Sequence, residues 1–240
     1  MRYLLTAFFT FFFAFSAQAD SSGWELEKED DDIGLKIYTR SVEGSNLKEF
    51  KGEMNVNARL TSLAMLLLDN KAAPEWMHNC EKFEVVENLG VNNSIFYLIN
   101  SAPWPVSDRD AVFQSALVQD PETLTITATV ESMPDRLPLD DDYIRIPTMK
   151  GGWTFSLNED NSVKVVYQVH AEPGGSLPSW LANAVVVDTP YHTMNNMLKM
   201  LKKDKYAHAA AEFIQDEKPA QVDGVSVEST TSDETAAEAQ

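Results

Sequence analysis

The chain has 240 residues, 44% of them hydrophobic and 23% charged, which is the balance of one sizeable globular domain with extensions. Its formal net charge of −18 argues against nucleic acid and anionic membranes as partners, because both need a basic face. The single cysteine, Cys80, excludes an internal disulfide framework and a multi-cysteine metal site. We expect no metal or cofactor, and we expect the chain to be a monomer.

Residues 1–19 have the pattern of a signal peptide. Arg2 supplies a positive charge at the start, Tyr3–Phe15 is an apolar run, and Ala17–Ala19 fits the small-x-small cleavage rule. The apolar run is short for a membrane span, although an uncleaved N-terminal anchor stays an alternative. Cleavage after Ala19 predicts a periplasmic or secreted protein.

Three strands and a helix are predicted in the first third of the chain. Alternating apolar residues indicate strands at Leu35–Arg40 and Leu47–Val56, with an edge strand before them in Trp24–Asp32. In Asn57–Asp69 the apolar spacing changes to three and four, which predicts a helix with Asn57 as its N-cap.

Four consecutive strands follow a short helix or turn in Asn70–Asn79. Turn residues separate apolar runs at Glu81–Leu89, Ser94–Asn100, Ala111–Gln119 and Thr123–Ser132. The short links between these runs predict an antiparallel meander. A loop in Met133–Asp142 then leads to a last hairpin, formed by Tyr143–Asn158 and Ser162–Glu172.

The last predicted element is a long helix over Leu177–Lys203. Pro178 suits its first turn, and Pro190 is expected to kink or break it. Its predicted inward stripe comprises Leu181, Ala184, Val185, Asp188, Tyr191, Asn195 and Leu198. Residues 206–240 form an acidic tail with little apolar content, expected to be disordered beyond about residue 215, so the domain is predicted to span residues 20–205.

The most distinctive stretch, Ser101–Val112, lies between two predicted strands. Pro103 and Pro105 flank Trp104, and proline does not fit inside a central strand, so the stretch predicts strand, rigid turn, strand. The turn ends in Asp108–Asp110, where an arginine between two carboxylates can bond bidentately and pin the loop to the strand. Taken singly, each residue also fits an ordinary β-turn with surface charges.

This stretch, Pro-Trp-Pro followed by Ser-Asp-Arg-Asp, resembles the central signature of the START (StAR-related lipid-transfer) domain family. Four further stretches resemble the family in the same order along the chain: Pro74–Cys80, Tyr143–Arg145, Gly151–Phe155 and Gly174–Asn183. The resemblance runs from Trp24 to Lys203, which is nearly the whole chain between the predicted signal peptide and the tail.

The resemblance implies an α+β helix-grip fold, START-like and Bet v 1-like, in which a curved antiparallel sheet wraps around a long C-terminal helix. It also implies an internal hydrophobic tunnel, closed by that helix and by loops, that binds and transfers one lipid or other hydrophobic molecule. The expected lining comprises Phe96, Leu98, Val130, Trp153, Phe155, Val165, Tyr167, Leu181, Val185 and Leu198, with the charged Arg109, Arg145 and Asp188. The two arginines would orient a head group, and transfer would need transient membrane contact. Each apolar residue of this set also suits a plain core position.

One departure from the family argues against a sterol ligand. Animal sterol-binding members carry a buried arginine a few residues beyond the Arg-Asp pair, whereas Phe113–Ser115 is uncharged here. A fatty acid, a phospholipid or a hydrophobic metabolite is therefore expected.

Two other classes of function stay open. A helix-grip enzyme, such as a polyketide cyclase or hydrolase, would need an acid or base in the tunnel, for which the sequence offers His78, His170, His192 and Asp188. None of these forms a recognisable triad or metal set by its spacing, and Asp188 is the best placed. A protein-interaction module would instead use the acidic tail or exposed loops.

Overall fold

The structure, a computed structural model, describes residues 23–217, apart from the side chains of Ser179, Trp180 and Asn183. The predicted signal peptide and residues 218–240 of the predicted tail lie outside the described residues. Within the described part, no helix is long and apolar enough to cross a membrane.

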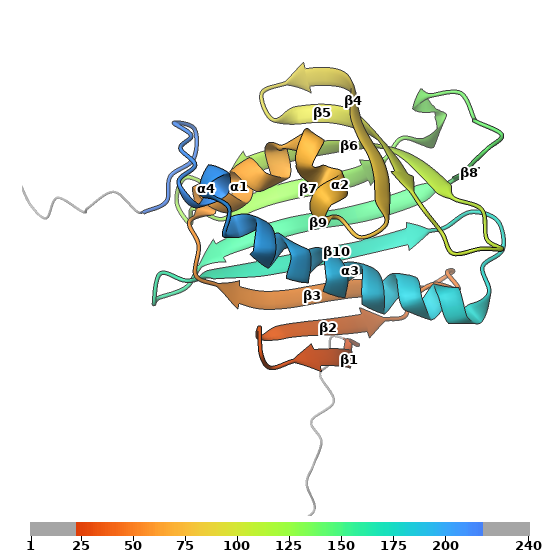
Figure 1. Ribbon diagram of the computed structural model, residues 1–240, viewed down its shortest axis with the longest axis horizontal. Helices are drawn as coiled ribbons and strands as arrows, with labels where there is room; N and C mark the ends of the chain where they lie inside the picture. The colour runs from red at the N-terminus through yellow and green to blue at the C-terminus, as the bar shows by residue number, and fades with distance from the viewer. Residues whose placement is uncertain (1–22, 218–240) are drawn as a thin grey trace, which may run out of the picture.

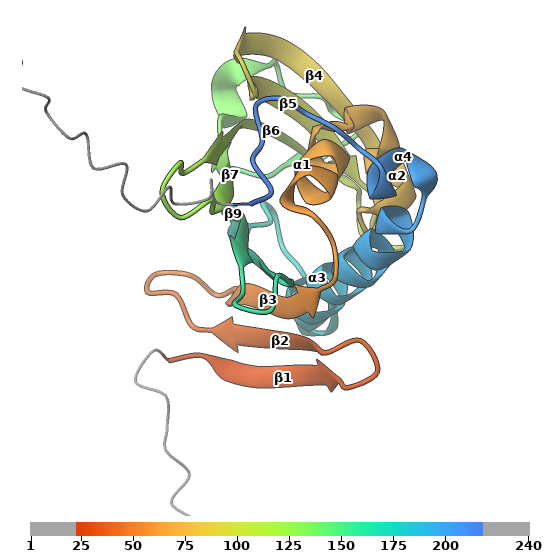
Figure 2. The ribbon, with the colours of Figure 1, turned by 90° about the vertical axis from the view of Figure 1, so that its left-hand side faces the viewer.

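The fold is one strongly curved sheet with helices on its concave side (Figure 1 and Figure 2). The strands are β1 (Glu25–Asp30), β2 (Leu35–Arg40), β3 (Glu49–Val56), β4 (Cys80–Gly90), β5 (Asn93–Asn100), β6 (Arg109–Gln119), β7 (Ile126–Ser132), β8 (Ile144–Arg145), β9 (Thr148–Leu157) and β10 (Val163–Glu172). They follow the order β1-β2-β3-β10-β9-β7-β6-β5-β4, and β8 pairs in parallel with β6 beside this path. All other pairings are antiparallel, so the predicted meander is confirmed for β4 to β7.

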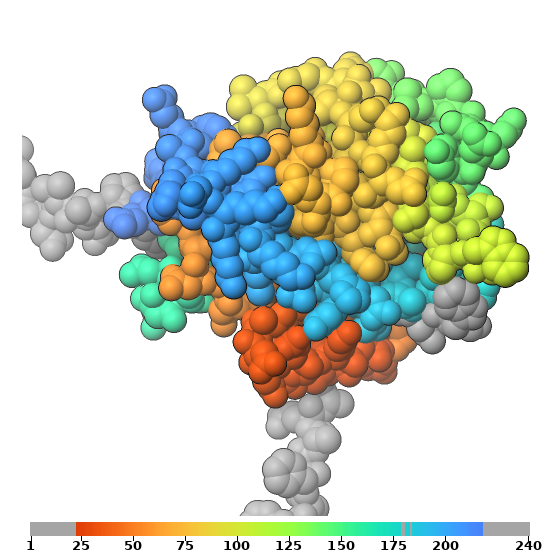
Figure 3. Space-filling model, viewed as in Figure 1, coloured from red at the N-terminus to blue at the C-terminus, as the bar shows by residue number. Residues whose placement is uncertain are grey.

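The helices are α1 (Leu60–Leu68), α2 (Ala73–Trp76), α3 (Ser179–Leu201) and α4 (Asp204–Ala207), with the short 3-10 turns η1 (Asn70–Ala72) and η2 (Pro134–Arg136). The long helix α3 crosses the concave face of the sheet (Figure 1). Figure 3 shows its surface between the N-terminal strands, in red, and the segment around α2 and β4, in orange and yellow. The expected helix-grip architecture is confirmed.

Two adjacent glycines shape the middle strand of the sheet, β9. Gly151 and Gly152 have φ angles of 139° and 142°, a region that residues with a side chain rarely adopt. A Cβ atom on Gly151 would lie 2.0 Å from the carbonyl oxygen of Gln168 on β10, and one on Gly152 would lie 1.9 Å from that of Ala128 on β7. Glycine inside a strand is typical of bends, so this pair allows β9 to turn between both neighbours.

The main core lies where α1 and α3 cover the sheet. Leu63 and Leu66 of α1 and Met194 and Met197 of α3 are fully buried there. Helix α3 approaches β3 closely at Gly52, where a Cβ atom would lie 2.3 Å from the sulfur of Met194. The long apolar side chains therefore fill the space between helix and sheet over this half of the molecule.

The buried face of α3 differs from the predicted stripe. Its buried positions include Leu181, Val186, Pro190, Thr193, Met194, Met197, Met200 and Leu201. Asp188 and Tyr191 point sideways toward β1, where the hydroxyl of Tyr191 donates to Asp30 at 2.7 Å and Lys28 lies 3.8 Å from Asp188. The predicted stripe is confirmed at Leu181, but it included Asp188 and Tyr191 and omitted the proline, threonine and methionines that pack inward.

Three local predictions need correction. Helix α3 continues through Pro190, so the expected break is wrong, while a kink there stays a prediction; buried residues on either side hold both halves against the sheet. The single strand predicted for Tyr143–Asn158 is two strands, because Pro147 separates β8 from β9. The N-cap of α1 is Arg59 instead of Asn57, and the Arg59 side chain makes no capping hydrogen bond.

The folded domain also extends past the predicted boundary at residue 205. Tyr206 is 2% exposed, its hydroxyl donates to Asp69 at 2.7 Å, and Ile214 is buried against the main core. Arg59 at the start of α1 donates to the backbone carbonyls of Ala207 and Ala209. The segment after α3 is therefore part of the domain up to about residue 216.

This segment supplies the cap that α1 lacks. The backbone N–H of Thr61 donates to one carboxylate oxygen of Asp216 at 2.8 Å, and the Thr61 hydroxyl donates to the other at 2.8 Å. A carboxylate at the N-terminus of a helix satisfies free N–H groups and favours the helix dipole. The Asp216 carboxylate thus caps α1 from 155 residues away along the chain.

We expect Asp216→Ala to lower the free energy of unfolding by about 1 kcal/mol, the usual effect of losing a helix cap. Urea denaturation of the variant and the wild type measures this difference. Glu212→Ala is the matched control, since Glu212 is an exposed acid in the same segment. Equal stability of the two variants would show that the Asp216 carboxylate does not stabilise α1.

Candidate functional site

Two cavities lie between the concave face of the sheet and the helices. We name the first, lined by Phe83, Phe96, Phe113, Trp153 and Tyr167 among others, the aromatic chamber; it encloses about 970 Å³, including its opening to solvent. The second, lined by Arg109 and one face of α3, we name the arginine chamber; it encloses about 990 Å³ on the same measure. Met77, Leu98, Met149, Tyr167 and Val169 line both, so the two chambers adjoin through a shared wall.

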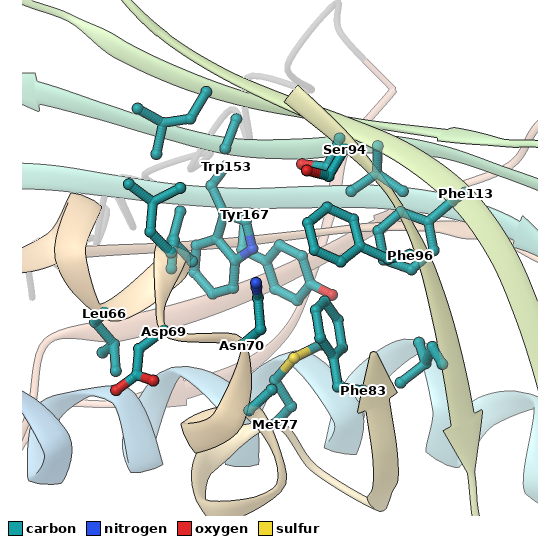
Figure 4. Close-up of a pocket in the computed structure, with 18 of the residues that line it drawn as sticks. Leu66, Asp69, Asn70, Met77, Phe83, Ser94, Phe96, Phe113, Trp153 and Tyr167 are labelled. Carbon is teal, nitrogen blue, oxygen red and sulfur yellow. The ribbon is translucent and has the colours of Figure 1, made fainter. Parts of the chain in front are cut away.

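The aromatic chamber is built by strand alternation. Ser94, Phe96 and Leu98 of β5 are spaced by two, so all three face the concave side. Phe96 stacks on Phe113 of β6 with ring centres 5.6 Å apart, and it lies 5.1 Å from the ring of Phe83 on β4. The result is a continuous aromatic wall from three neighbouring strands (Figure 4).

Tyr167 closes the opposite side of this chamber. Its ring stacks on that of Trp153 with centres 3.9 Å apart and planes within 5°. Figure 4 shows the Tyr167 hydroxyl pointing toward Phe83 and Phe96, into the space between the two aromatic groups. Burial raises the pKa of Tyr167, so the hydroxyl stays neutral and can donate or accept a hydrogen bond.

The arginine chamber lies under the first half of α3. Leu181, Val185, Thr189 and Thr193, spaced by four, form one face of the helix and line it. Its rim includes Ala102 and Pro103 from the β5–β6 loop, and Pro173 and Leu177 from the β10–α3 loop.

Arg109, the first residue of β6, is the charged side chain in the lining of this chamber. It is 6% exposed, and its Nη1 donates to the carbonyl of Ser107. Its Nε and Nη2 atoms are buried and have no hydrogen-bond partner among the described residues. Burial lowers the pKa of Arg109, but a guanidinium keeps its charge in proteins at neutral pH.

The carboxylates on either side of Arg109 face away from the chamber. Asp108 accepts the N–H of Ala102 at 2.7 Å, and Asp110 accepts two hydrogen bonds from Arg145, at 2.9 and 2.8 Å. Arg145 also donates to backbone carbonyls of the β7–β8 loop, including that of Leu137. The predicted bidentate pair therefore exists, but its arginine is Arg145; the expectation that Arg109 fills this role was wrong, because alternation along β6 turns it to the opposite face.

The structure brings together eight of the residues named from the sequence as ligand contacts. Phe96, Leu98, Val130, Trp153, Tyr167, Arg109, Leu181 and Val185 line one or both chambers. The other five lie elsewhere: Phe155 and Val165 are fully buried in the main core, Leu198 packs against it, Arg145 binds Asp110, and Asp188 faces Lys28.

Comparison with known proteins decides the family. The profile of the START domain matches residues 13–206, which is most of the chain. The chain belongs to the START domain family.

Relatives of this START domain include bacterial and mammalian proteins. It is 31% identical to an uncharacterized protein of Pseudomonas aeruginosa over 191 residues, 80% of this chain and 93% of that protein. It is 26% identical to the human ceramide transfer protein over 189 residues, 68% of this chain but 29% of that longer protein. Among solved structures, a fragment of the STAR-related lipid transfer protein of Xanthomonas axonopodis is 42% identical, with a TM-score of 0.68 over 75% of this chain and 99% of that one.

Several residues that line the chambers of this START domain were not predicted from the sequence. Phe113 and Leu117 follow from alternation along β6, and that signal was present in the sequence. Trp76, from the short helix α2, is 3% exposed, and its indole N–H has no hydrogen-bond partner among the described residues. Met77 and Met149 lie in irregular or terminal positions where no periodicity marks them.

Two histidines link α3 to the connection between α2 and β4. The rings of His78 and His192 lie 4.7 Å apart, and the backbone N–H of His78 donates to the Thr193 hydroxyl at 3.0 Å. Burial lowers the pKa of His78, and the neighbouring His192 adds to this, while Asp188 opposes it. The folded protein therefore favours the neutral form of His78.

We expect the free energy of unfolding to fall as the pH drops below about 6.5, because the unfolded chain then takes up a proton at His78 that the folded chain resists. Denaturation at about pH 7.5 and about pH 5.5 measures the decline. His78→Gln should show a smaller decline than the wild type. The control is His208→Gln, whose ring is exposed; an identical decline in both variants would contradict the assignment to His78.

Proposed function

We propose that this START domain binds one lipid or other hydrophobic small molecule in the two adjoining chambers. The observation that carries the proposal is the aromatic chamber, a pocket on the concave side of the sheet with walls of Phe, Trp, Leu and Val side chains and a few polar groups. Two relatives support it by name, the Xanthomonas lipid transfer protein and the human ceramide transfer protein. The chain spans 29% of the latter, so only the domain, and not that protein's whole activity, is compared.

Burial of an apolar chain supplies the affinity. Each CH₂ group moved from water into an apolar space contributes about 0.8 kcal/mol, so about ten such groups contribute about 8 kcal/mol before the entropy of association is subtracted. Polar groups at the arginine chamber would receive the head of such a ligand while the chain occupies the aromatic chamber. The ligand would thus lie along the concave side of the sheet.

Closure of the chambers by α3 and the loops is part of the proposal. The rim of the arginine chamber combines the β5–β6 loop, the β10–α3 loop and the first turns of α3. Exchange of a ligand larger than this opening needs a displacement of one of these elements. The His78–His192 contact and the Thr193 hydrogen bond fix α3 farther along, so the first turns of α3 are the part we expect to move.

We further propose that the β5–β6 loop touches a membrane during transfer. Trp104 is 91% exposed, and the adjacent Pro103 lines the rim of the arginine chamber. Tryptophan prefers the interface between water and lipid. The prolines on either side restrict the backbone and so hold the ring exposed to solvent. The net charge of −18 favours a neutral or zwitterionic surface over an anionic one.

The proposed setting is the periplasm or the outside of the cell. This follows from the signal peptide pattern in residues 1–19, with its small-x-small site at Ala17–Ala19. A carrier in such a compartment would move its ligand through water between membranes or between a membrane and another protein.

We propose binding without catalysis. Asp188, the best candidate base of a helix-grip enzyme, is half exposed, pairs with Lys28 and lines neither chamber. Burial raises the pKa of the Cys80 thiol to about 11, which disfavours a nucleophilic thiolate. In the part of the chain that the structure covers, no group of three or more His, Cys, Asp or Glu side chains is placed to hold a metal ion.

Native mass spectrometry of the mature protein purified from its own compartment should show one adduct of lipid mass. Val130→Trp, which fills the aromatic chamber, should remove the adduct and leave the circular dichroism spectrum unchanged. Val85→Trp is the control, since Val85 is 45% exposed on β4. An apo protein that takes up nothing from a total lipid extract would overturn the proposed function.

Trp104→Ala should slow ligand transfer between zwitterionic vesicles several-fold while leaving the binding of ligand in solution unchanged. A fluorescent lipid assay with donor and acceptor vesicles measures the rate. Phe213→Ala is the matched control, because Phe213 is also exposed but lies beside the far end of β6. Equal rates for all three proteins would show that the tryptophan makes no membrane contact of consequence.

A further inference from the structure

The two arginines with buried side chains, Arg109 of β6 and Arg145 of β8, differ in one respect. Arg145 uses its Nε and Nη2 atoms, the side edge of the guanidinium, to hold both oxygens of Asp110 at 2.9 and 2.8 Å. Arg109 has the same edge buried in the arginine chamber, where its Nε and Nη2 atoms have no partner among the described residues. A buried charged donor without an acceptor is strongly unfavourable, so an anion bound at this edge would stabilise it.

The orientation of Arg109 is fixed by the fold. Its backbone pairs with Asn100 of β5, and its Nη1 atom donates to the carbonyl of Ser107. These contacts hold the guanidinium while leaving the Nε–Nη2 edge free of any contact within the described residues. An edge held in this way is preorganised for a planar acceptor with two oxygens.

No acidic side chain of the described residues lines the arginine chamber to neutralise this charge. The charge of Asp108 raises the pKa of Arg109 and so opposes the effect of burial. Its carboxylate accepts the N–H of Ala102, however, and makes no ion pair with the arginine. The other titratable group in the lining is His78, whose neutral form is favoured. The chamber therefore holds one net positive charge inside a chain of net charge −18.

We propose that Arg109 binds the carboxylate of the ligand, and that the ligands of this START domain are long-chain carboxylic acids. The proposal rests on the proposed function and names its substrate class. The carboxylate would occupy the Nε–Nη2 edge as Asp110 occupies that of Arg145, with the chain in the aromatic chamber. A phosphate monoester carries close to two charges at neutral pH, so a single guanidinium matches a carboxylate better than it matches that group.

Strand β5 runs from the arginine chamber, which would hold the carboxylate, to the aromatic chamber, which would hold the acyl chain. Asn100 and Leu98 line the arginine chamber, and Leu98, Phe96 and Ser94 line the aromatic chamber. Successive residues of this row are two apart on one face, so the row from Asn100 to Ser94 is about 20 Å long. A long acyl chain fastened at Arg109 can therefore reach the aromatic wall.

The test compares oleic acid with oleyl alcohol, which has the same chain and no charge, as ligands of the mature protein at about pH 8. The wild type should bind the acid at least about 10-fold more tightly, since a hydrogen-bonded charge contributes about 1.5–3 kcal/mol. Arg109→Gln should abolish this preference while still binding the alcohol, which shows that the variant is folded. Arg136→Gln is the control, because Arg136 is an exposed arginine paired with Glu87.

Each other outcome contradicts the proposal in a distinguishable way. Equal binding of acid and alcohol by the wild type, or an unchanged preference in Arg109→Gln, would overturn the carboxylate assignment and leave lipid binding intact. Tighter binding of oleoyl lysophosphatidic acid than of oleic acid, lost in Arg109→Gln, would replace the carboxylate with a phosphate head group. Competition by butyrate at the concentration of the lipid would show a site for free small anions. Failure to bind either oleyl ligand would overturn this inference together with the proposed function.

Discussion

The ion pair between Asp110 and Arg145 is the interaction on which the site depends. Both side chains are buried, at 1% and 7% exposure, and removal of either would leave an uncompensated charge inside the protein. The pair holds the parallel contact between β6 and β8 and fastens the β7–β8 loop through its backbone carbonyls. Because Asp110 must face this pair, its neighbour Arg109 must face the chamber. A structural salt bridge on one face of a strand thus sets the direction of a functional charge on the other.

The interior of the molecule is divided according to how the helices cover the sheet. Where α1 and α3 lie close to the strands, long side chains such as Met194 and Phe155 fill the space completely. Toward β4, β5 and β6 a space remains between the sheet and the helices α1 and α2, and Phe83 and Phe96 line it. The cavity is therefore the part of the concave side that no helix fills, and the phenylalanines of its wall contact one another without a ligand.

Much of this could be predicted from the sequence, and the rest depends on distances that a sequence does not contain. The lining that the family resemblance implied includes Phe96, Leu98 and Tyr167, and all three line the chambers. The same expected lining included Phe155 of β9 and Val165 of β10, which also face inward but are packed in the main core. The partner of Asp110 lies 35 residues away and the cap of α1 lies 155 residues away, so neither contact leaves a local signal. On the inward face of α3, Leu181 and Val185 were predicted, but Pro190 and Thr193 were missed because hydrophobic periodicity does not count proline and threonine.

The glycine pair in β9 has a consequence for how such a sequence can diverge. At both positions the obstacle to a side chain is a carbonyl oxygen of a neighbouring strand, so no exchange of side chains elsewhere can make room for one. The chamber walls, by contrast, border empty space, where a larger or smaller residue meets no backbone. Substitutions can therefore change the residues that contact the ligand while Gly151 and Gly152 are retained. Related proteins could then keep this fold and bind different ligands.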